Sequence, residues 1–546
     1  MSVYVQLQAL AFVLLTIFLA YVATILVPYL RRRPDPVGDP SAFSWHVLVP
    51  CRNEEAVIGS SLRRLRTRFP QAHIWVIDDA SDDDTAAIIA GAAETDPHIH
   101  LVRRVFPDAQ TGKGDALNAA YRALLAWLPQ GADHEKVIVT VVDADGDLAE
   151  NALALVASDR VFGDPVVGAA QCQVAMFEAP PDASRFARLL RALQDAEFRT
   201  TIAAMQMLRG HTISVGIGGN GQFSRLSALD VIGVQAGDPW HGSLLEDYEL
   251  SLHMMLAGYE IRYVHDAVVS QEAVAALPAL VRQRTRWCQG GIQCLRYLRD
   301  VAASPMVTPA ATCEMAYFLT TPLQTLVGIV VWPVVLIGMA VVGAHAAGGL
   351  IAWIVASWWL IPLVLLTGIA PFATWGYLYG REREWNVAAS VAFGVAYWLY
   401  SYLTQIYVVN AFRRLALGQN GWVKTQRLKE VGLEAGAVED VLEIQAHSAA
   451  VAGSRVADIV PQAGRGDFAA RSSHTRVSRE AHRGPLSPHR PRPRRQARRP
   501  RCTPRAGPRG CSPLCSCCWR RWRCSSSRTR SWRPRRTSPP TSPASA

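Results

Sequence analysis

The first segment of the chain is apolar and ends in a block of positive charge. Residues 1–30 carry no charged side chain, and three arginines follow at 31–33. At about 1.5 Å per residue, a helix over 7–30 is long enough to cross a hydrocarbon core of roughly 30 Å. A cleavable signal peptide has its positive charge before the apolar run. We therefore predict an uncleaved membrane anchor over 1–33, with the chain that follows in the cytoplasm.

The pattern changes at Ser44 to short apolar runs that end in acidic or glycine-rich turns, with helical patterns between them. Because strands alternate with helices, we predict an α/β fold with a mostly parallel central sheet over residues 44–300. Ligands bind such sheets at the carboxyl ends of the strands, where the acidic turns occur. The expected strands are 46–50, 73–77, 136–142 and 166–170, and the expected helices include 56–69 and 114–128.

Two later stretches, 315–380 and 385–412, also lack charged residues. Their lengths predict transmembrane helices over residues 313–412. Small residues at 344–349 favour two long spans in the first stretch, although its length also fits three short ones. Basic residues directly after the second stretch favour a cytoplasmic location for the segment 413–450. This location requires three spans in the first stretch, because two would leave the segment on the outer side of the membrane.

Composition indicates a hybrid of a globular part and a membrane part, since 50% of the 546 residues are hydrophobic and 18% are charged. The net charge of +11 comes from residues 451–546, which hold 23 Arg, no Lys and 3 acidic residues. The first 450 residues hold 33 basic and 42 acidic residues. We therefore expect no nucleic acid as a partner of the body of the protein.

Residues 451–546 are rich in Arg, Pro and Ser, a composition that does not form a packed core. We predict a disordered tail there. The enriched residue types have GC-rich codons, so out-of-frame translation of a GC-rich gene is a second explanation.

The tail cysteines lack the partner spacing of a zinc site. The five cysteines of the body show no paired framework, which indicates a reducing compartment.

Two pairs of carboxylates follow predicted strands. Asp78 and Asp79 end the strand at 73–77, where an ordinary helix cap is the simplest explanation. Asp143 and Asp145 follow a strand rich in β-branched residues, which predicts burial on both faces. Mg²⁺ takes one or two protein carboxylates together with phosphate oxygens. We therefore expect the second pair to face a divalent cation and a diphosphate.

Three other residues stand at predicted helix starts. Lys113 lies between two glycines, where a cation and backbone amides can approach phosphate. Glu246 and Asp247 precede an amphipathic helix over 249–256. One of these two acids can cap that helix, and the other is then free to act as a base.

A further motif combines Gln283, Arg286 and Trp287. An arginine can neutralise a leaving diphosphate, and a tryptophan can stack on a sugar ring. An interfacial helix before the membrane explains the same residues, and both interpretations can hold together. The predicted α/β domain over 44–300 therefore ends in an interfacial helix.

Together these motifs resemble those of the processive, membrane-integrated, inverting family 2 glycosyltransferases, the group that contains cellulose, chitin, hyaluronan and poly-N-acetylglucosamine synthases. The resemblance covers about residues 1–430 in the order anchor, Asp-Asp, Asp-x-Asp, Glu-Asp, Gln-x-x-Arg-Trp and membrane spans. It implies a GT-A-type domain that uses a nucleotide sugar such as a UDP-sugar to extend a β-linked polysaccharide and pass it through the membrane. It also implies a multi-pass plasma membrane protein with a cytoplasmic catalytic domain.

The resemblance implies roles for individual residues as well. Asp247 is the expected general base, and Asp145 is the expected ligand of Mg²⁺ or Mn²⁺. The three-residue segment 219–221 lies where the family lines the acceptor side, and the motif 422–425 resembles a cytosolic substrate-proximal motif. The expected contacts to the nucleotide, the diphosphate and the acceptor come from Asp78 or Asp79, Lys113, Asp143, Glu246, Gln283, Arg286 and Trp287.

Three functions fit these observations. The first is a polymerising β-glycosyltransferase, whose partners are a nucleotide sugar, a growing glycan and membrane lipids. The second is transfer of a single sugar to a lipid or a short glycan. The third is a catalytically inactive membrane scaffold, or a nucleic-acid binder that acts through the tail. Residues 413–470 lack the motifs of a cyclic-di-GMP receptor domain, which argues against the bacterial cellulose synthase type.

Overall fold

The structure is a computed structural model, and it describes residues 2–419. The expected juxtamembrane segment 413–450 is therefore described only as far as Gln419. The motif 422–425 and the tail 451–546 lie outside the described residues.

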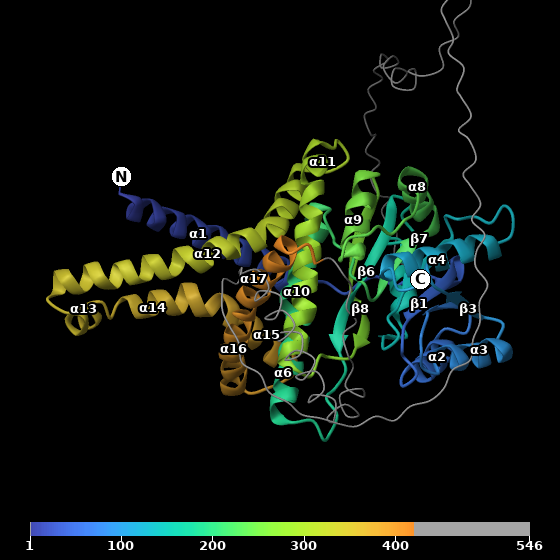
Figure 1. Cartoon of the computed structure of the whole chain (residues 1–546), viewed down its shortest axis with the longest axis horizontal. Helices are drawn as coiled ribbons and strands as arrows, with labels where there is room; N and C mark the ends of the chain where they lie inside the picture. Colours follow the sequence, from blue (N-terminus) through green and yellow to red (C-terminus); the bar gives the residue numbers. More distant parts are fainter. Residues whose placement is uncertain (1, 420–546) are drawn as a thin grey trace, which may run out of the picture. The chain divides into compact units, whose positions relative to one another are not determined.

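An eight-stranded sheet follows the first helix, α1 (Val3–Leu30), and its strand order is β3-β2-β1-β4-β7-β6-β8-β5 (Figure 1). The pairs β3-β2, β2-β1, β1-β4 and β6-β8 are parallel, and the other pairs are antiparallel. The predicted α/β fold with a mostly parallel sheet is confirmed. The strands are β1 Ser44–Cys51, β2 His73–Asp79, β3 Ile99–Arg104, β4 Val137–Val141, β5 Asp147–Leu148, β6 Val167–Met176, β7 Gln222–Arg225 and β8 Glu260–Gln271.

Helices connect and cover these strands, and the predicted helices at 56–69 and 114–128 are confirmed as α2 and α4. A π-helical turn, η2 (Glu197–Ile202), joins α6 and α7 into one continuous helical segment. The helices are α2 Ile58–Arg68, α3 Thr85–Thr95, α4 Lys113–Trp127, α5 Ala152–Val156, α6 Arg185–Ala196, α7 Ala203–Thr212, α8 Leu226–Ala236, α9 Glu246–Leu256, α10 Leu277–Gln293 and α11 Leu298–Ala303.

The strand β4 lies inside the sheet, and all five of its residues are buried. Successive side chains of a strand point to opposite faces of the sheet. Val139 and Val141 accordingly pack into one apolar cluster, whereas Ile138 and Val142 pack into another. Because both faces are covered, β-branched residues suit every position, as the sequence predicted. The turn that carries Asp143 therefore starts from a rigid strand.

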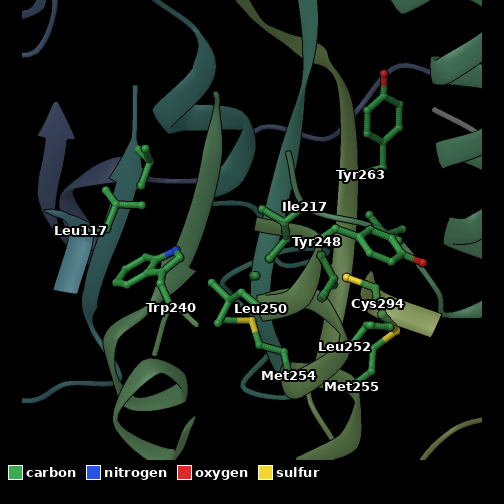
Figure 2. Close-up of a cluster of buried hydrophobic side chains, with 14 of the residues drawn as sticks. Leu117, Ile217, Trp240, Tyr248, Leu250, Leu252, Met254, Met255, Tyr263 and Cys294 are labelled. Carbon is green, nitrogen blue, oxygen red and sulfur yellow. The ribbon is translucent and has the colours of Figure 1, made fainter. Parts of the chain in front are cut away.

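The helix α9 is buried on almost all sides. Leu250, Leu252, Met254 and Met255 are at most 3% exposed, and Figure 2 shows them in one cluster with Cys294. A helix with apolar residues all round is stable only inside a core. Its first turn carries Glu246 and Asp247, so the packing of the whole helix positions these two acids.

Four helical segments of the described chain are long and apolar enough to cross a membrane. The stretch 315–380 forms two of them, which agrees with the first of the two arrangements that its sequence allows. In Figure 1, α12, α13 and α14 extend away from the sheet. The segments are α1, α12 (Pro309–Ala347), α14 to α15 (Leu360–Val364 and Ala370–Glu382) and α16 to α17 (Val387–Ser401 and Leu403–Ala416), and α13 is Leu350–Ala356.

The helix α10 packs directly on the chain that leads into α9. A Cβ atom added at Gly290 would lie 2.7 Å from the backbone nitrogen of Leu245, far inside van der Waals contact. A Cβ atom at the next position, Gly291, would have no neighbour within 4 Å. Glycine at position 290 therefore allows a helix-to-backbone contact that no other residue permits.

Gly290→Ala should lower the free energy of unfolding by about 1–3 kcal/mol, because an added methyl group overpacks the contact. Gly291→Ala is the matched control, and it should raise stability by up to about 1 kcal/mol because alanine favours the helix. Thermal unfolding of both variants in detergent, followed by tryptophan fluorescence, measures the difference. Equal shifts at the two positions would contradict this packing.

Candidate active site

One cavity of about 1750 Å³ opens at the carboxyl ends of β2 and β4. Its wall brings together nine of the ten predicted site residues, which come from separate parts of the sequence. They are Asp79, Lys113, Asp143, Asp145, Glu246, Asp247, Gln283, Arg286 and Trp287.

The tenth predicted residue, Asp78, lies beneath the cavity wall. It is 1% exposed, and its carboxylate accepts a hydrogen bond from the backbone N–H of Ser81 at 3.2 Å. Asp79 lines the cavity instead and accepts from the guanidinium of Arg104 and from the backbone N–H of Gln110. Of the two predicted candidates for a nucleotide contact, the geometry therefore favours Asp79.

Lys113 is the first residue of α4, and its ammonium group reaches into the acidic part of the cavity. It donates to Asp143 Oδ1 at 2.6 Å and to the carbonyl oxygen of Gly219 at 2.8 Å. Burial opposes the charge of this ammonium, but Asp143 and Glu246 outweigh it and raise the pKa of Lys113. The lysine therefore stays positive and can attract phosphate oxygens.

Gly219 passes between this lysine and the predicted base. A Cβ atom there would lie 2.9 Å from Lys113 Nζ and 3.1 Å from Asp247 Oδ2. Any side chain at this position would push the two groups out of place. Gly219 and Asn220 both line the cavity, which is where the sequence placed the segment 219–221.

The turn after β4 offers oxygen ligands for a cation. Asp143 and Asp145 line the cavity, and the intervening Ala144 is buried. The backbone N–H of Glu272 donates to Asp145 Oδ2 at 3.2 Å and orients that carboxylate. Carboxylate oxygens are the ligands that Mg²⁺ and Mn²⁺ prefer. The two side chains therefore fit the expected divalent ion.

Glu246 and Asp247 lie in the first turn of α9, after the N-cap residue Leu245, which makes no side-chain cap bond. The carboxylate of Asp247 accepts from the backbone N–H of Tyr248 in the same turn at 2.6 Å. Burial and the neighbouring charge of Glu246 raise the pKa of Asp247 to about 7, against the opposing effect of Lys113. Burial also raises the pKa of Glu246. A carboxylate with a pKa near 7 is a far better proton acceptor than an exposed aspartate.

The helix α10 supplies the opposite wall. Gln283, Arg286 and Trp287 line the cavity from this helix. Burial lowers the pKa of Arg286, whereas Glu246 and Asp143 act in the other direction. A guanidinium remains charged at neutral pH in any case, so Arg286 adds positive charge on the side facing the acids.

The sequence motif does not reveal how Trp287 is held. The guanidinium carbon of Arg284 lies 4.2 Å from the centre of the Trp287 ring, and the same guanidinium bonds Glu197 at 2.8 Å. Glu197 also accepts from the hydroxyl of Tyr400 at 2.8 Å. Glu197 and Tyr400 lie far along the chain from the motif, so only the fold could identify them as support for the platform.

A second group of possible metal ligands is formed by α9 and the chain that precedes it. Ligand atoms of His241, Glu249 and His253 lie within 4.8 Å of one another. Glu249 is fully buried and already accepts hydrogen bonds from Arg296, Tyr297 and the backbone N–H of Ser243. Arg296 thus supplies the positive charge that a metal would bring. This group stabilises the chain that leads into the first turn of α9.

Comparison with known proteins identifies the type of domain. Residues 44–290 match the family model described as glycosyltransferase like family 2. The chain is 31% identical over 284 residues to the beta-monoglucosyldiacylglycerol synthase of Trichormus variabilis, with 50% of this chain and 54% of the relative covered. It is 26% identical over 255 residues to the poly-beta-1,6-N-acetyl-D-glucosamine synthase of Staphylococcus epidermidis, with 46% of this chain and 55% of the relative covered.

The chain spans about half the length of these curated relatives. Among solved structures, a mannosyltransferase from Pyrobaculum calidifontis in complex with GDP-Man and Mn²⁺ is similar, with a TM-score of 0.44 and 19% identity over 72% of this chain and 99% of the other. The family match and the mostly parallel sheet confirm the expected GT-A-like fold. Residues 44–290 are therefore similar to glycosyltransferase family 2 domains.

Proposed function

We propose that this protein is an inverting glycosyltransferase that moves one sugar from a nucleotide sugar, such as a UDP-sugar, to a hydroxyl group of a membrane lipid. Its α/β domain faces the cytoplasm, since Arg31, Arg32 and Arg33 follow α1 directly. Of the two curated relatives compared above, the one with the higher identity is named for synthesis of a glucosylated lipid. A lipid acceptor agrees with that name.

The continuity of the cavity carries this proposal. The cavity that Asp247 lines also reaches aliphatic side chains of the apolar helices. Most of the side chains on this part of the lining are apolar, so acyl chains fit it. A glycan that passed there would lose water from its hydroxyl groups and find few hydrogen-bond partners besides Thr321, Gln324, Thr325 and Thr367. A lipid can therefore present its headgroup hydroxyl at Asp247 while its chains lie along the helices. The aliphatic lining includes Leu14 and Leu15 of α1, Ile329 and Leu336 of α12, and Val364 of α14.

The chemistry needs a base on one side of the sugar and positive charge on the other. The acceptor oxygen attacks the anomeric carbon, the bond from that carbon to the diphosphate breaks, and the acceptor proton passes to Asp247. Lys113 and Arg286 stabilise the departing diphosphate. Asp143 and Asp145 would hold Mg²⁺ or Mn²⁺, which supplies further positive charge when it is bound. Attack opposite the leaving group inverts the anomeric centre.

Extension of a β-linked polysaccharide is the second candidate, and aromatic residues on the same cavity favour it. Aromatic faces stack on sugar rings, so a row of them could guide a growing glycan. The tyrosines of the last apolar segment that line the cavity include Tyr397, Tyr400 and Tyr407.

An acceptor assay separates the two candidates. The purified full-length protein in nanodiscs is incubated with radiolabelled UDP-glucose, UDP-N-acetylglucosamine or GDP-mannose, with and without diacylglycerol. We expect label in the lipid fraction, one sugar per lipid, and only when diacylglycerol is present. A water-soluble product that lengthens with time, in discs free of diacylglycerol, would refute the lipid proposal and support the polymerase.

The rate of transfer should fall as the pH drops through about 7, because Asp247 accepts a proton only when it is ionised. Glu246→Gln should move this limb of the pH profile to lower pH, since the charge of Glu246 raises the pKa of Asp247. Asp115→Asn changes an exposed acid of α4 and should leave the profile unchanged.

Asp247→Asn should lower kcat at least about 100-fold with donor affinity largely kept.

Gly219→Ala should lower turnover at least about tenfold without loss of the fold, because the added methyl group displaces the mobile end of Lys113 and not a backbone atom. The matched control is Gly218→Ala, whose Cβ atom would meet only Gln171, at an ordinary 3.6 Å. Steady-state kinetics and thermal unfolding of both variants test this. Equal activity in the two would show that the spacing of Lys113 and Asp247 is not critical.

A further inference from the structure

The last apolar segment, Val387–Ala416, is long enough in total to cross a membrane, but it is made of two short helices. The α16 helix has 15 residues and the α17 helix has 14. Only Tyr402 separates them. At about 1.5 Å per residue, neither helix alone reaches across a hydrocarbon core of roughly 30 Å, whereas the segment as a whole does. Whether the segment crosses therefore depends on where its two ends lie.

The beginning of this segment is tied to the α/β domain. Arg383, just before α16, bonds Asp195 at 2.7 Å and Glu178 at 2.9 Å. The preceding residue, Glu382, bonds Arg32 at 2.8 Å. Arg32 belongs to the positive block that follows α1. The start of α16 thus lies on the side of the membrane that carries the active site.

The middle of the segment is tied to the same domain. The hydroxyl of Tyr397 lies 2.7 Å from the hydroxyl of Thr201, and the hydroxyl of Tyr400 donates to Glu197 at 2.8 Å. Thr201 and Glu197 belong to η2, the turn that joins α6 and α7. In a crossing helix these tyrosines would stand near the centre of the bilayer, away from any part of the α/β domain.

The end of the segment returns to α10. Arg414 donates to the side-chain oxygen of Gln289 at 2.8 Å, and the amide of Gln289 donates to the carbonyl oxygen of Gln419 at 2.7 Å. Gln289 is a fully buried residue of the helix that carries Arg286 and Trp287. The start, the middle and the end are thus all bonded to one folded domain.

We propose that Val387–Ala416 does not cross the membrane but lies in the interface of the leaflet that faces the active site. The ends of a spanning helix are separated by the full bilayer, so one domain cannot bind both of them. The described chain then crosses the membrane with α1, α12 and the segment Leu360–Glu382. Gln419 lies on the same side as the active site. Figure 1 shows α17 beside α10 and α16 beside α15, while α12 and α14 extend away.

The exposed face of this segment fits the acyl chains of that leaflet. Its large exposed side chains recur every three or four residues, so they form one stripe along both helices. Such a stripe on a helix bonded to a domain along its other face is typical of interfacial helices. The stripe consists of Val391, Val395, Leu399, Tyr402, Ile406 and Val409, which are 41–58% exposed.

The other face of the segment forms part of the cavity wall, through Tyr400, Leu403 and Tyr407 among others. An interfacial position therefore places these residues between the leaflet and the active site. A lipid that enters the cavity laterally passes them. This consequence depends on the proposed lipid acceptor, whereas the location of the segment does not.

Cysteine labelling in sealed membrane vesicles of both orientations tests the location. The full-length background has serine at Cys288, at Cys313 and at the six cysteines of residues 451–546, and single cysteines replace Ala346, Glu384 or Leu417. A membrane-impermeant maleimide should label Glu384→Cys and Leu417→Cys in the same vesicles, and Ala346→Cys in the opposite ones. Labelling of Leu417→Cys on the side opposite to Glu384→Cys would overturn the proposal.

Depth measurement provides an independent test that does not need enzyme activity. Spin labels are placed at Leu399 and, as the deep control, at Ile337 of α12, which is 64% exposed. In nanodiscs, the label at position 399 should respond less to oxygen and more to a water-soluble nickel chelate than the label at 337. A segment that crosses would put position 399 near the bilayer centre. Equal depth at the two positions would therefore overturn the proposal.

Discussion

The burial of several carboxylates around one ammonium group governs the chemistry of this protein. Asp143, Glu246 and Asp247 all act on Lys113, and removing so many charges from water without a counterion would cost several kcal/mol for each ion. Lys113 compensates Asp143 most directly, through a bond of 2.6 Å. At Asp247, burial and the neighbouring charge of Glu246 outweigh the effect of Lys113, so the pKa of Asp247 rises to about 7. The same burial that threatens stability thus produces a base suited to neutral pH.

The helix α10 joins this charge cluster to the membrane part. One of its faces carries Arg286 and Trp287 into the cavity, and Gly290 lets it rest on the backbone that leads into α9. Arg284 of the same helix bonds Glu197 of η2. The proposed roles of base, diphosphate clamp and aromatic platform therefore fall on residues of one packed body, namely Asp247, Arg286 and Trp287. A shift of α10 would disturb all three together, which explains why its contacts are so close.

The cavity has two chemically different ends. Near β4 it is charged, whereas beside α1 and α12 its lining is mostly aliphatic and aromatic. In the proposed function, a polar donor and an apolar acceptor approach from these opposite ends and meet at Asp247. The buried pair of Arg209 and Glu314, bonded at 2.7 Å between α7 and α12, fixes the relation of the two ends. Such a pair is costly to form but more costly to break, so it favours one arrangement of the domain on its membrane helices.

Much of this protein can be predicted from sequence alone, because the relevant signals are local. Charge-free runs show apolar helices, β-branched runs ending in Asp143 and Asp145 show buried strands, and nine of the ten predicted site residues share one cavity. Sequence could not decide between Asp78 and Asp79, since their order along the strand does not reveal which side chain faces the cavity. Glu197, Gly219 and Tyr400 acquire their roles only through contacts between distant segments. Hydropathy likewise measures how apolar Val387–Ala416 is, whereas the bonds at its ends, which only the tertiary structure contains, determine where it lies.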